Sequence, residues 1–317
     1  MPNPITLKLG TRASPLALTQ STTVARTLER LHPGLTVELV EISTTGDRVT
    51  GQSLASFGGA GVFVKELETA LQDKRIDFAV HSLKDMPTKQ PEGLVLAAVS
   101  QREDARDAAI VHGGATLASL PKGSVIGCGS PRRRAQLKAR YPHLEFAEIR
   151  GNVDTRLRKV DEGQYAGTML ALAGLKRLGL DARVTEIISY DDMLPAPGQG
   201  ALGIECRKAD LEIRKLLNAL NDRATAASVV AERAVLEALG GGCHLPLGAL
   251  GTVSAETRIL KLQAVLGHPD GSMMIRFDCS GATDFPEALG HIAAAELLKI
   301  GGKELIERLR SEGAKGV

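Results

Sequence analysis

The chain has 317 residues, a formal net charge of +2, 43% hydrophobic residues and 24% charged residues. This composition is typical of a folded globular protein of roughly two or three domains, and it argues against a disordered chain. The longest apolar runs, such as residues 94–99, are only as long as a strand, so we expect no membrane span. The first residues lack the apolar core of a signal peptide, and we therefore expect a cytoplasmic protein.

The N-terminal segment begins with a strand, a helix and a second strand. Residues 5–9 and 36–43 alternate in polarity, as half-buried strands do. Between them, Ser14 is a candidate N-cap and Pro15 occupies a favoured first helical position, which predicts a helix to about residue 31. This order is typical of an α/β fold.

The same alternation continues toward residue 100. Glycines at 51–61 predict a mobile loop, which is followed by an amphipathic helix over 63–72 and a short buried strand over 78–80. Strands that alternate with helices predict a mixed, mainly parallel sheet with helices on both faces.

A second lobe with similar organisation follows. Residues 124–127 read as a strand, and Ser130 and Pro131 begin a helix that reaches about residue 141. This repeats the strand, Ser-Pro, helix order of the first lobe, so we expect two similar α/β lobes. The glycine- and proline-rich stretch 194–203 reads as a hinge.

The C-terminal part has a different order of elements. A helix over 224–239 is stopped by three glycines, and strand signals at 259–266 and 273–278 precede a last helix from 285 to about 310. Strands that come before a helix indicate a smaller α+β domain. We therefore predict lobe 1 from 1–100 with 201–220, lobe 2 from 101–200, and a C-terminal domain over 221–317.

The first candidate site is the segment 81–87, which directly follows a buried strand. Ligands of open α/β sheets bind beyond the carboxyl ends of strands. Asp85, with Lys84 beside it, is suited to protonate a leaving group or stabilise a cation. The pattern from Ser82 to Asp85 also fits a helix capping box, and spacing alone favours that structural interpretation.

A basic cluster forms the second candidate. Residues 131–160 contain nine basic side chains against three acidic ones. Arginine suits bidentate binding of carboxylate or phosphate, and cations at a helix start oppose the helix dipole unless a ligand needs them. We favour a small polyanionic ligand. The alternatives are a solvated face or a nucleic-acid patch, and only nine aromatic residues are available for stacking bases.

The third candidate is Cys243, which three glycines precede. A thiolate presented on such a loop can serve as a nucleophile or as a covalent anchor. The alternative is a C-cap glycine followed by a buried cysteine. Cys128, Cys206 and Cys279 lack the glycine frame and read as core thiols. The cysteine spacings resemble no metal site, so we expect no metal.

Taken together, a series of segments in chain order resembles the porphobilinogen deaminase (hydroxymethylbilane synthase) family. The resemblance covers nearly the whole chain. The segments are 9–17, 63–67, 81–87, Arg132-Arg133 with 135–137, 150–153 with 155–157, 170–171 with 173–179, 195–207 and 241–243.

The resemblance implies a fold, a reaction and a cofactor. The family has two lobes like periplasmic binding proteins and a third domain that carries the cofactor cysteine on a loop. It is a transferase of tetrapyrrole biosynthesis, of the haem and chlorophyll type. It joins four porphobilinogen molecules head to tail into linear hydroxymethylbilane and releases ammonia at each addition. Its cofactor is a dipyrromethane, attached through the cysteine that matches Cys243.

The resemblance also implies roles for single residues. The carboxylate that matches Asp85 would assist loss of the amine and stabilise the azafulvenium cation, with Lys84 beside it. A further set would bind the acetate and propionate side chains of cofactor and substrate. Its members are Arg12, Ser14, Lys84, Ser130, Arg132, Arg133, Arg150, Arg156 and Arg177.

Some positions depart from the family pattern. Ala60 and Ser56 stand where lysines occur, which removes cationic contacts from the glycine loop. Cys128 and Pro131 replace residues near the arginine pair, and Asp154 adds an acid near the basic cluster. None of these changes affects Cys243 or Asp85, so we expect activity to survive.

Two other classes of function remain as alternatives. A non-enzymatic, two-lobed protein that binds a small anion would need neither Cys243 nor a cofactor. A nucleic-acid binder would use residues 132–140, but the net charge of +2 and the few aromatics count against it. We therefore expect a monomer that acts on porphobilinogen and has no nucleic-acid or membrane partner.

Overall fold

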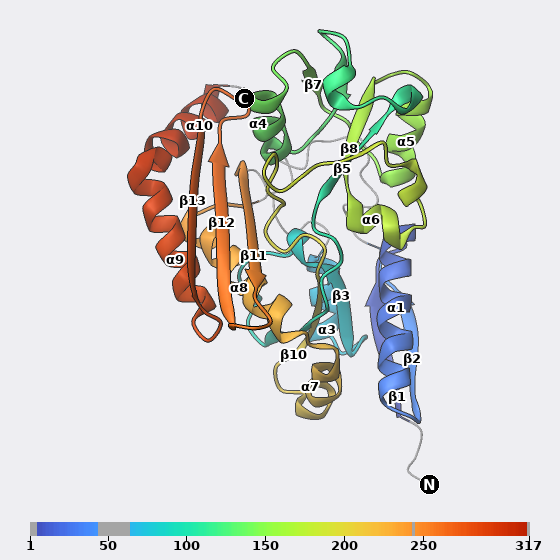
Figure 1. Ribbon diagram of the computed structural model, residues 1–317. Coiled ribbons are helices and arrows are strands. Elements are labelled where there is room, and N and C mark those ends of the chain that lie inside the picture. The colour runs from blue at the N-terminus through green and yellow to red at the C-terminus, as the bar shows by residue number, and fades with distance from the viewer. Residues whose placement is uncertain (1–4, 44–63, 243–244, 316–317) are drawn as a thin grey trace. The chain divides into compact units, whose positions relative to one another are not determined.

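A computed structural model describes residues 5–43, 64–242 and 245–315, and Figure 1 shows the elements. The chain forms two compact units. Unit 1 comprises Met1–Glu103, Lys176–Leu178 and Gly200–Ala226, and unit 2 comprises Asp104–Leu175, Gly179–Gln199 and Ala227–Val317. The division of the chain into three domains with the boundaries given above stays a prediction.

Unit 1 is built on a five-stranded mixed sheet with the order β2-β1-β3-β10-β4. β1 runs parallel to β2 and β3, whereas β10 runs antiparallel to β3 and β4. The strands are β1 (Ile5–Thr11), β2 (Leu35–Glu41), β3 (Phe78–Ser82), β4 (Leu94–Val99) and β10 (Leu202–Arg207). A late segment of the chain therefore inserts between two early strands, which sequence periodicity does not reveal.

Helices cover both faces of this sheet, as predicted. α1 (Pro15–Leu31) begins where Ser14 accepts a hydrogen bond from the nitrogen of Ala17. α1 and α7 (Leu211–Leu217) pack on the face that carries Phe78 and Ile204. α3 (Lys65–Gln72) packs on the opposite face, which carries Ala79.

Unit 2 contains a second five-stranded mixed sheet with the order β7-β6-β8-β5-β9. Its strands are β5 (Asp107–Val111), β6 (Val125–Gly127), β7 (Glu145–Ala147), β8 (Gly167–Ala171) and β9 (Glu186–Ile187). The helices near it are α4 (Pro131–Arg140), α5 (Val153–Asp161) and α6 (Leu172–Arg177). Ser130 caps α4 and Pro131 begins it, so the predicted repeat of strand, Ser-Pro and helix is confirmed.

The C-terminal part of unit 2 forms a three-stranded antiparallel sheet. Its strands are β11 (Leu247–Val253), β12 (Ile259–Gly267) and β13 (Met274–Ala282), and its helices are α8 (Arg223–Ala238), α9 (Pro286–Leu297) and α10 (Lys303–Lys315). Our prediction of one continuous last helix is wrong. Gly301 has a φ of 120° within the segment Leu298–Gly302, and this left-handed residue separates α9 from α10.

Glu232 holds the stretch that the sequence predicts as a hinge to other parts of unit 2. The nitrogen of Gly198 donates to Oε2 of Glu232 at 2.6 Å, and the nitrogen of Gly251 donates to Oε1 at 2.7 Å. Gly198 has a φ of 76°, a conformation that favours glycine. The buried Glu232 thereby ties residue 198 to α8 and β11.

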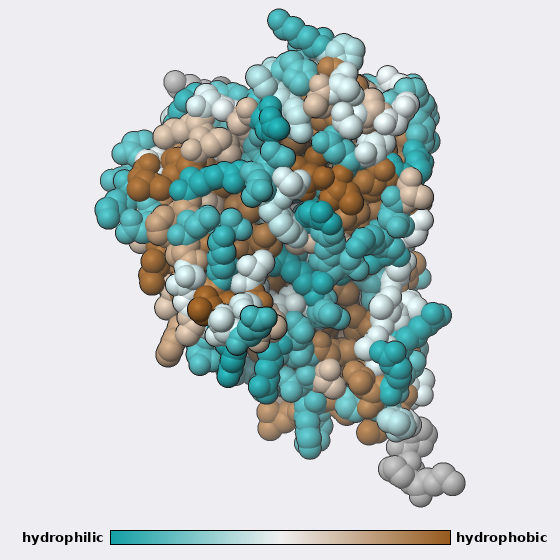
Figure 2. All heavy atoms as spheres, in the orientation of Figure 1, coloured by the Kyte–Doolittle hydropathy of each residue, from teal (hydrophilic) through white to brown (hydrophobic). Residues whose placement is uncertain are grey.

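The fold class is the predicted one, α/β with mixed sheets and a smaller C-terminal sheet. Hydrophilic and apolar residues alternate over the face drawn in Figure 2, as on the water-exposed surface of a globular protein. Within the described ranges, no helix combines the length and apolar character that crossing a membrane requires.

Candidate active site

The candidate active site of unit 1 is a small cavity at the end of β3. Its volume is about 90 Å³. Its polar lining residues come from two parts of the sequence, 12–20 and 81–85: Arg12, Ser14, Gln20, His81, Ser82 and Asp85. Leu16, Ala17, Val64, Leu67 and Val80 form the apolar part of the lining. The structure thus brings together three residues predicted for the site, Arg12, Ser14 and Asp85.

Asp85 reaches this cavity because β3 passes directly into a short 3-10 helix, Leu83–Asp85. The capping-box alternative for this segment is not found, because the Ser82 side chain caps no backbone group there. Its hydroxyl instead exchanges hydrogen bonds with the amide of Gln20, at 3.1 and 3.3 Å. Asp85 is exposed and Lys84 is half-buried. The segment therefore presents a carboxylate to the cavity.

The N-terminus of α1 supplies a second side of the cavity. Arg12 follows β1 and is half-buried. The Ser14 hydroxyl, besides lining the cavity, accepts from the nitrogen of Ala17 at 3.4 Å. A cationic side chain next to the N-terminus of a 17-residue helix favours an anionic ligand.

Arg177 also belongs to unit 1 by its contacts. Its Nη2 donates to the carbonyl oxygen of Gly200 at 2.6 Å. Burial lowers the pKa of its guanidinium, with the charge of Glu103 acting in the opposite direction.

Sequence analysis assigned no role to two buried residues, one that lines this cavity and one in contact with the first. Nε2 of His81 lies 3.0 Å from Oε2 of Glu205, and both side chains are buried. His81 lines the cavity, whereas Glu205 lies in the middle of β10. The signal that could have revealed Glu205 is a single carboxylate inside the otherwise apolar run of residues 201–206.

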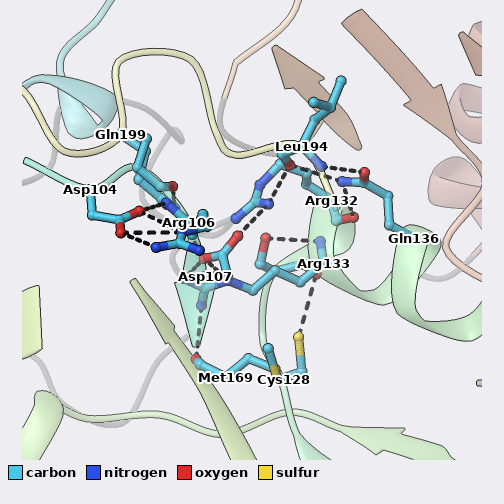
Figure 3. A network of polar contacts seen from close by, with 12 residues as sticks. Asp104, Arg106, Asp107, Cys128, Arg132, Arg133, Gln136, Met169, Leu194 and Gln199 are labelled. Atoms are coloured by element: carbon cyan, nitrogen blue, oxygen red, sulfur yellow. Dashed lines mark hydrogen bonds and ion pairs between the residues drawn. The ribbon is translucent and has the colours of Figure 1, made fainter. Parts of the chain in front are cut away.

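In unit 2, Arg132 and Arg133 form a buried ion-pair network, which Figure 3 shows. Nη1 of Arg132 donates to Oδ2 of Asp107 at 2.8 Å and to the carbonyl oxygen of Leu194 at 2.7 Å. Nε and Nη2 of Arg133 both donate to Oδ1 of Asp107, at 2.9 and 2.7 Å. Asp107 thus compensates two cations at the start of α4, which the helix dipole alone would disfavour.

One nitrogen atom of Arg132 takes no part in this network. The Nε of Arg132 is buried and has no hydrogen-bond partner among the described residues. Burial, the largest cause, lowers the pKa of Arg132, and Asp107 opposes that shift. An unsatisfied buried N–H is costly, so this atom is a candidate donor to a bound acceptor.

Two further predicted arginines lie beyond this network. Nε of Arg156, on α5, donates to the carbonyl oxygen of Gly151 at 2.8 Å. Burial lowers the pKa of Arg156, and the positive charge of Arg133 adds to that effect. Arg150 is paired with Oε1 of Glu148 through Nε and Nη2, at 2.9 and 2.8 Å.

The positions that depart from the family pattern fit their local structure. Pro131 occupies the first turn of α4, and Ser130 accepts from the nitrogen of Arg133 at 3.5 Å. Asp154 lies in the first turn of α5, where a negative charge stabilises the helix. Cys128 is buried, and burial raises the pKa of its thiol. Cys243, Ala60 and Ser56 lie outside the described residues.

No cluster in the described part of the chain has the His, Cys, Asp or Glu side chains that a metal ion would need. Cys128, Cys206 and Cys279 are free thiols, and burial raises the pKa of each, with the Cys206 thiol at about 11. These three thiols are therefore poor nucleophiles at neutral pH.

The sheets define an α/β protein. The cavity of unit 1 is lined by one cationic side chain, Arg12, and one carboxylate, Asp85. The family model "Porphobilinogen deaminase, dipyromethane cofactor binding domain" matches residues 7–215, and "Porphobilinogen deaminase, C-terminal domain" matches residues 226–299. The chain belongs to the porphobilinogen deaminase family. The family predicted from the sequence is therefore confirmed, as are its transferase class and its dipyrromethane cofactor, and the non-enzymatic alternative is set aside.

Curated relatives match over nearly their whole length. A porphobilinogen deaminase of Gloeobacter violaceus is 48% identical over 308 residues, which cover 96% of this chain and 94% of the relative. One of Acidithiobacillus ferrooxidans is 46% identical, with 97% of this chain and 99% of the relative covered.

Solved structures similar to this chain have lower sequence identity. The methionine binding protein MetQ is 16% identical at a TM-score of 0.44, with 69% of this chain and 90% of that chain covered. The BenM effector binding domain with benzoate is 14% identical at a TM-score of 0.41, with 68% and 89% covered.

The described residues fit a dipyrromethane with acidic side chains. A pyrrole that carries acetate and propionate needs cationic donors, and each unit, taken by itself, contains such a side chain: Arg12 in unit 1 and Arg156 in unit 2. The unpartnered Nε of Arg132 supplies a further buried donor. The polar atoms of Ser82 and Gln20 line the cavity beside Asp85.

Proposed function

We propose that this chain condenses four porphobilinogen molecules head to tail into linear hydroxymethylbilane and releases ammonia at each addition. The observation that carries the proposal is the cavity at the end of β3, where Asp85 and Arg12 lie together. The 48% identity to a curated porphobilinogen deaminase supports the same reaction.

Asp85 is the residue to which we assign the chemistry at the reacting carbon. Positive charge develops on the substrate as the amine leaves, and a carboxylate fixed at that place stabilises it electrostatically. Lys84 is the neighbour of Asp85 in the 3-10 helix Leu83–Asp85.

The basic residues are assigned to the carboxylates of cofactor and substrate. The set comprises Arg12, Ser14, Ser130, Arg132, Arg133, Arg150, Arg156 and Arg177. The dipyrromethane, when bound, supplies the pyrrole carbon to which the first substrate is joined. We assign its attachment to Cys243, the residue that matches the cofactor cysteine of the family.

We further propose that the enzyme acts as a monomer in the cytoplasm and has no nucleic-acid or membrane partner. The net charge of +2 supports this, because nucleic-acid binding needs a strongly basic surface.

A turnover assay with porphobilinogen tests the proposal. The purified chain should release ammonia and linear hydroxymethylbilane, and Asp85→Asn should lower kcat about 10²-fold or more. Asp73→Asn is the matched control, since Asp73 is an exposed carboxylate of the same unit. Absence of product from the wild-type chain, supplied with porphobilinogen to build its cofactor, would overturn the proposal.

A further inference from the structure

His81 and Glu205 form a buried pair that the assigned roles do not use. In the antiparallel register of β3 and β10, Glu205 lies opposite Ala79 and Gly203 lies opposite His81. Side chains alternate along a strand, so His81 and Glu205 point to the same face as diagonal neighbours. Nε2 of His81 lies 3.0 Å from Oε2 of Glu205.

Burial makes this contact a strong orienting interaction. His81 is 5% exposed and Glu205 is fully buried. A carboxylate on Nε2 holds the proton of a neutral imidazole there, because that nitrogen then donates the hydrogen bond. Nδ1 is then the ring nitrogen with a free lone pair, on a side chain that lines the cavity with Asp85.

A third ionisable side chain, Glu68 on α3, interacts electrostatically with both His81 and Glu205. Burial and the charge of Glu205 raise the pKa of Glu68 on α3, whereas His81 and Lys65 oppose that shift. The Oε1 atoms of Glu68 and Glu205 are both buried without a hydrogen-bond partner. Glu68 is thus a further carboxyl group that interacts with the His81–Glu205 pair from α3.

We propose that His81, oriented by Glu205, accepts the proton that the acceptor pyrrole carbon loses at each addition. This inference rests on the condensation proposed above. In that reaction a C–C bond forms between the substrate methylene and the pyrrole carbon, and the methylene C–N bond breaks. The aminomethyl group enters as ammonium and leaves as ammonia. The pyrrole C–H electrons return to the ring, and its proton passes to Nδ1 of His81.

Asp85 and His81 line the same cavity and have different roles in this assignment. Asp85 has to stay ionised to stabilise positive charge, and a carboxylate that took up the pyrrole proton would lose that capacity. His81 can take the proton because Glu205 compensates the imidazolium that results. Glu205 is thus a positioning residue, and His81 is the proton acceptor. The imidazolium of His81 then releases the proton to solvent, and the neutral imidazole can accept a proton at the next addition.

The first experiment uses porphobilinogen deuterated at its free pyrrole carbon. His81→Gln should lower kcat about 10²-fold or more, as for loss of a general base. Its isotope effect on kcat should exceed that of the wild type, because removal of the proton becomes rate-limiting. His268→Gln is the matched control, because Nε2 of His268 also pairs with a carboxylate, Oε2 of Glu312 at 2.9 Å.

The second experiment measures the tautomer of His81 by imidazole nitrogen NMR in the protein that carries its dipyrromethane cofactor. The wild type should show the proton on Nε2, and Glu205→Gln should show a mixture of tautomers with an unchanged unfolding temperature. Equal isotope effects in wild type and His81→Gln, or a wild-type ring protonated on Nδ1, would overturn the inference. Lack of turnover in the wild type would instead overturn the proposed function.

Discussion

Asp107 binds Arg133 through a single carboxylate oxygen, which accepts from Nε and Nη2 at 2.9 and 2.7 Å. Its other oxygen accepts from Arg132, so one fully buried carboxylate compensates two buried guanidinium groups. Two arginines that the sequence marks as ligands for an anion are therefore already bound to an anion of the chain itself. The buried Nε of Arg132 has no hydrogen-bond partner among the described residues and remains available to a ligand.

Asp107→Asn should destabilise the protein strongly. The substitution leaves two buried positive charges without compensation, which typically costs about 3–5 kcal/mol of the free energy of unfolding. Urea denaturation measures the change. Asp192→Asn, which removes the half-buried partner of the exposed Arg140, should cost about 1 kcal/mol or less. Equal costs at the two positions would contradict the role given to Asp107.

Arg156→Gln should weaken substrate use and leave stability nearly unchanged. If Arg156 binds a carboxylate, kcat/KM should fall about 10- to 100-fold, because a charged hydrogen bond is worth about 1.5–3 kcal/mol. Arg158→Gln provides the control on the same helix, where Arg158 forms an exposed pair with Glu162. Initial-rate kinetics at varied porphobilinogen measure both. The assignment of Arg156 fails if the two variants behave alike.

Glu68 should make stability depend on pH in a defined direction. Its folded pKa is raised above 4.5 by burial and by Glu205, so its contribution to stability is present below pH 4.5. That contribution is lost as pH rises through the folded pKa. Glu68→Gln cannot ionise, so the variant should gain stability relative to the wild type between about pH 4 and pH 8. Thermal unfolding across that range measures the difference, and a constant difference would refute the shift.

Local signals predicted much of the fold and of the site. Ser14 with Pro15 and Ser130 with Pro131 fix the starts of α1 and α4, because capping depends on neighbours in sequence. Asp85 was found because a carboxylate follows a buried strand, which places it at the sheet edge.

Contacts distant in sequence could not be predicted in this way. Glu205 meets His81 across 124 residues, and only the insertion of β10 beside β3 brings them together. Arg132 and Arg133 gave a clear basic signal, but their partner Asp107 lies on β5 and carries no local sign of the pairing. The break at Gly301 was missed because a single glycine also occurs inside continuous helices.

The covalent cofactor is the central claim, and the intact mass of the purified chain tests it most directly. The wild type, after incubation with porphobilinogen, should exceed the mass of the 33.5 kDa chain by at least two linked pyrrole units. Cys243→Ser should lack that addition, whereas Cys279→Ser should retain it. An unmodified wild-type chain, or an addition that persists in Cys243→Ser, would contradict the account.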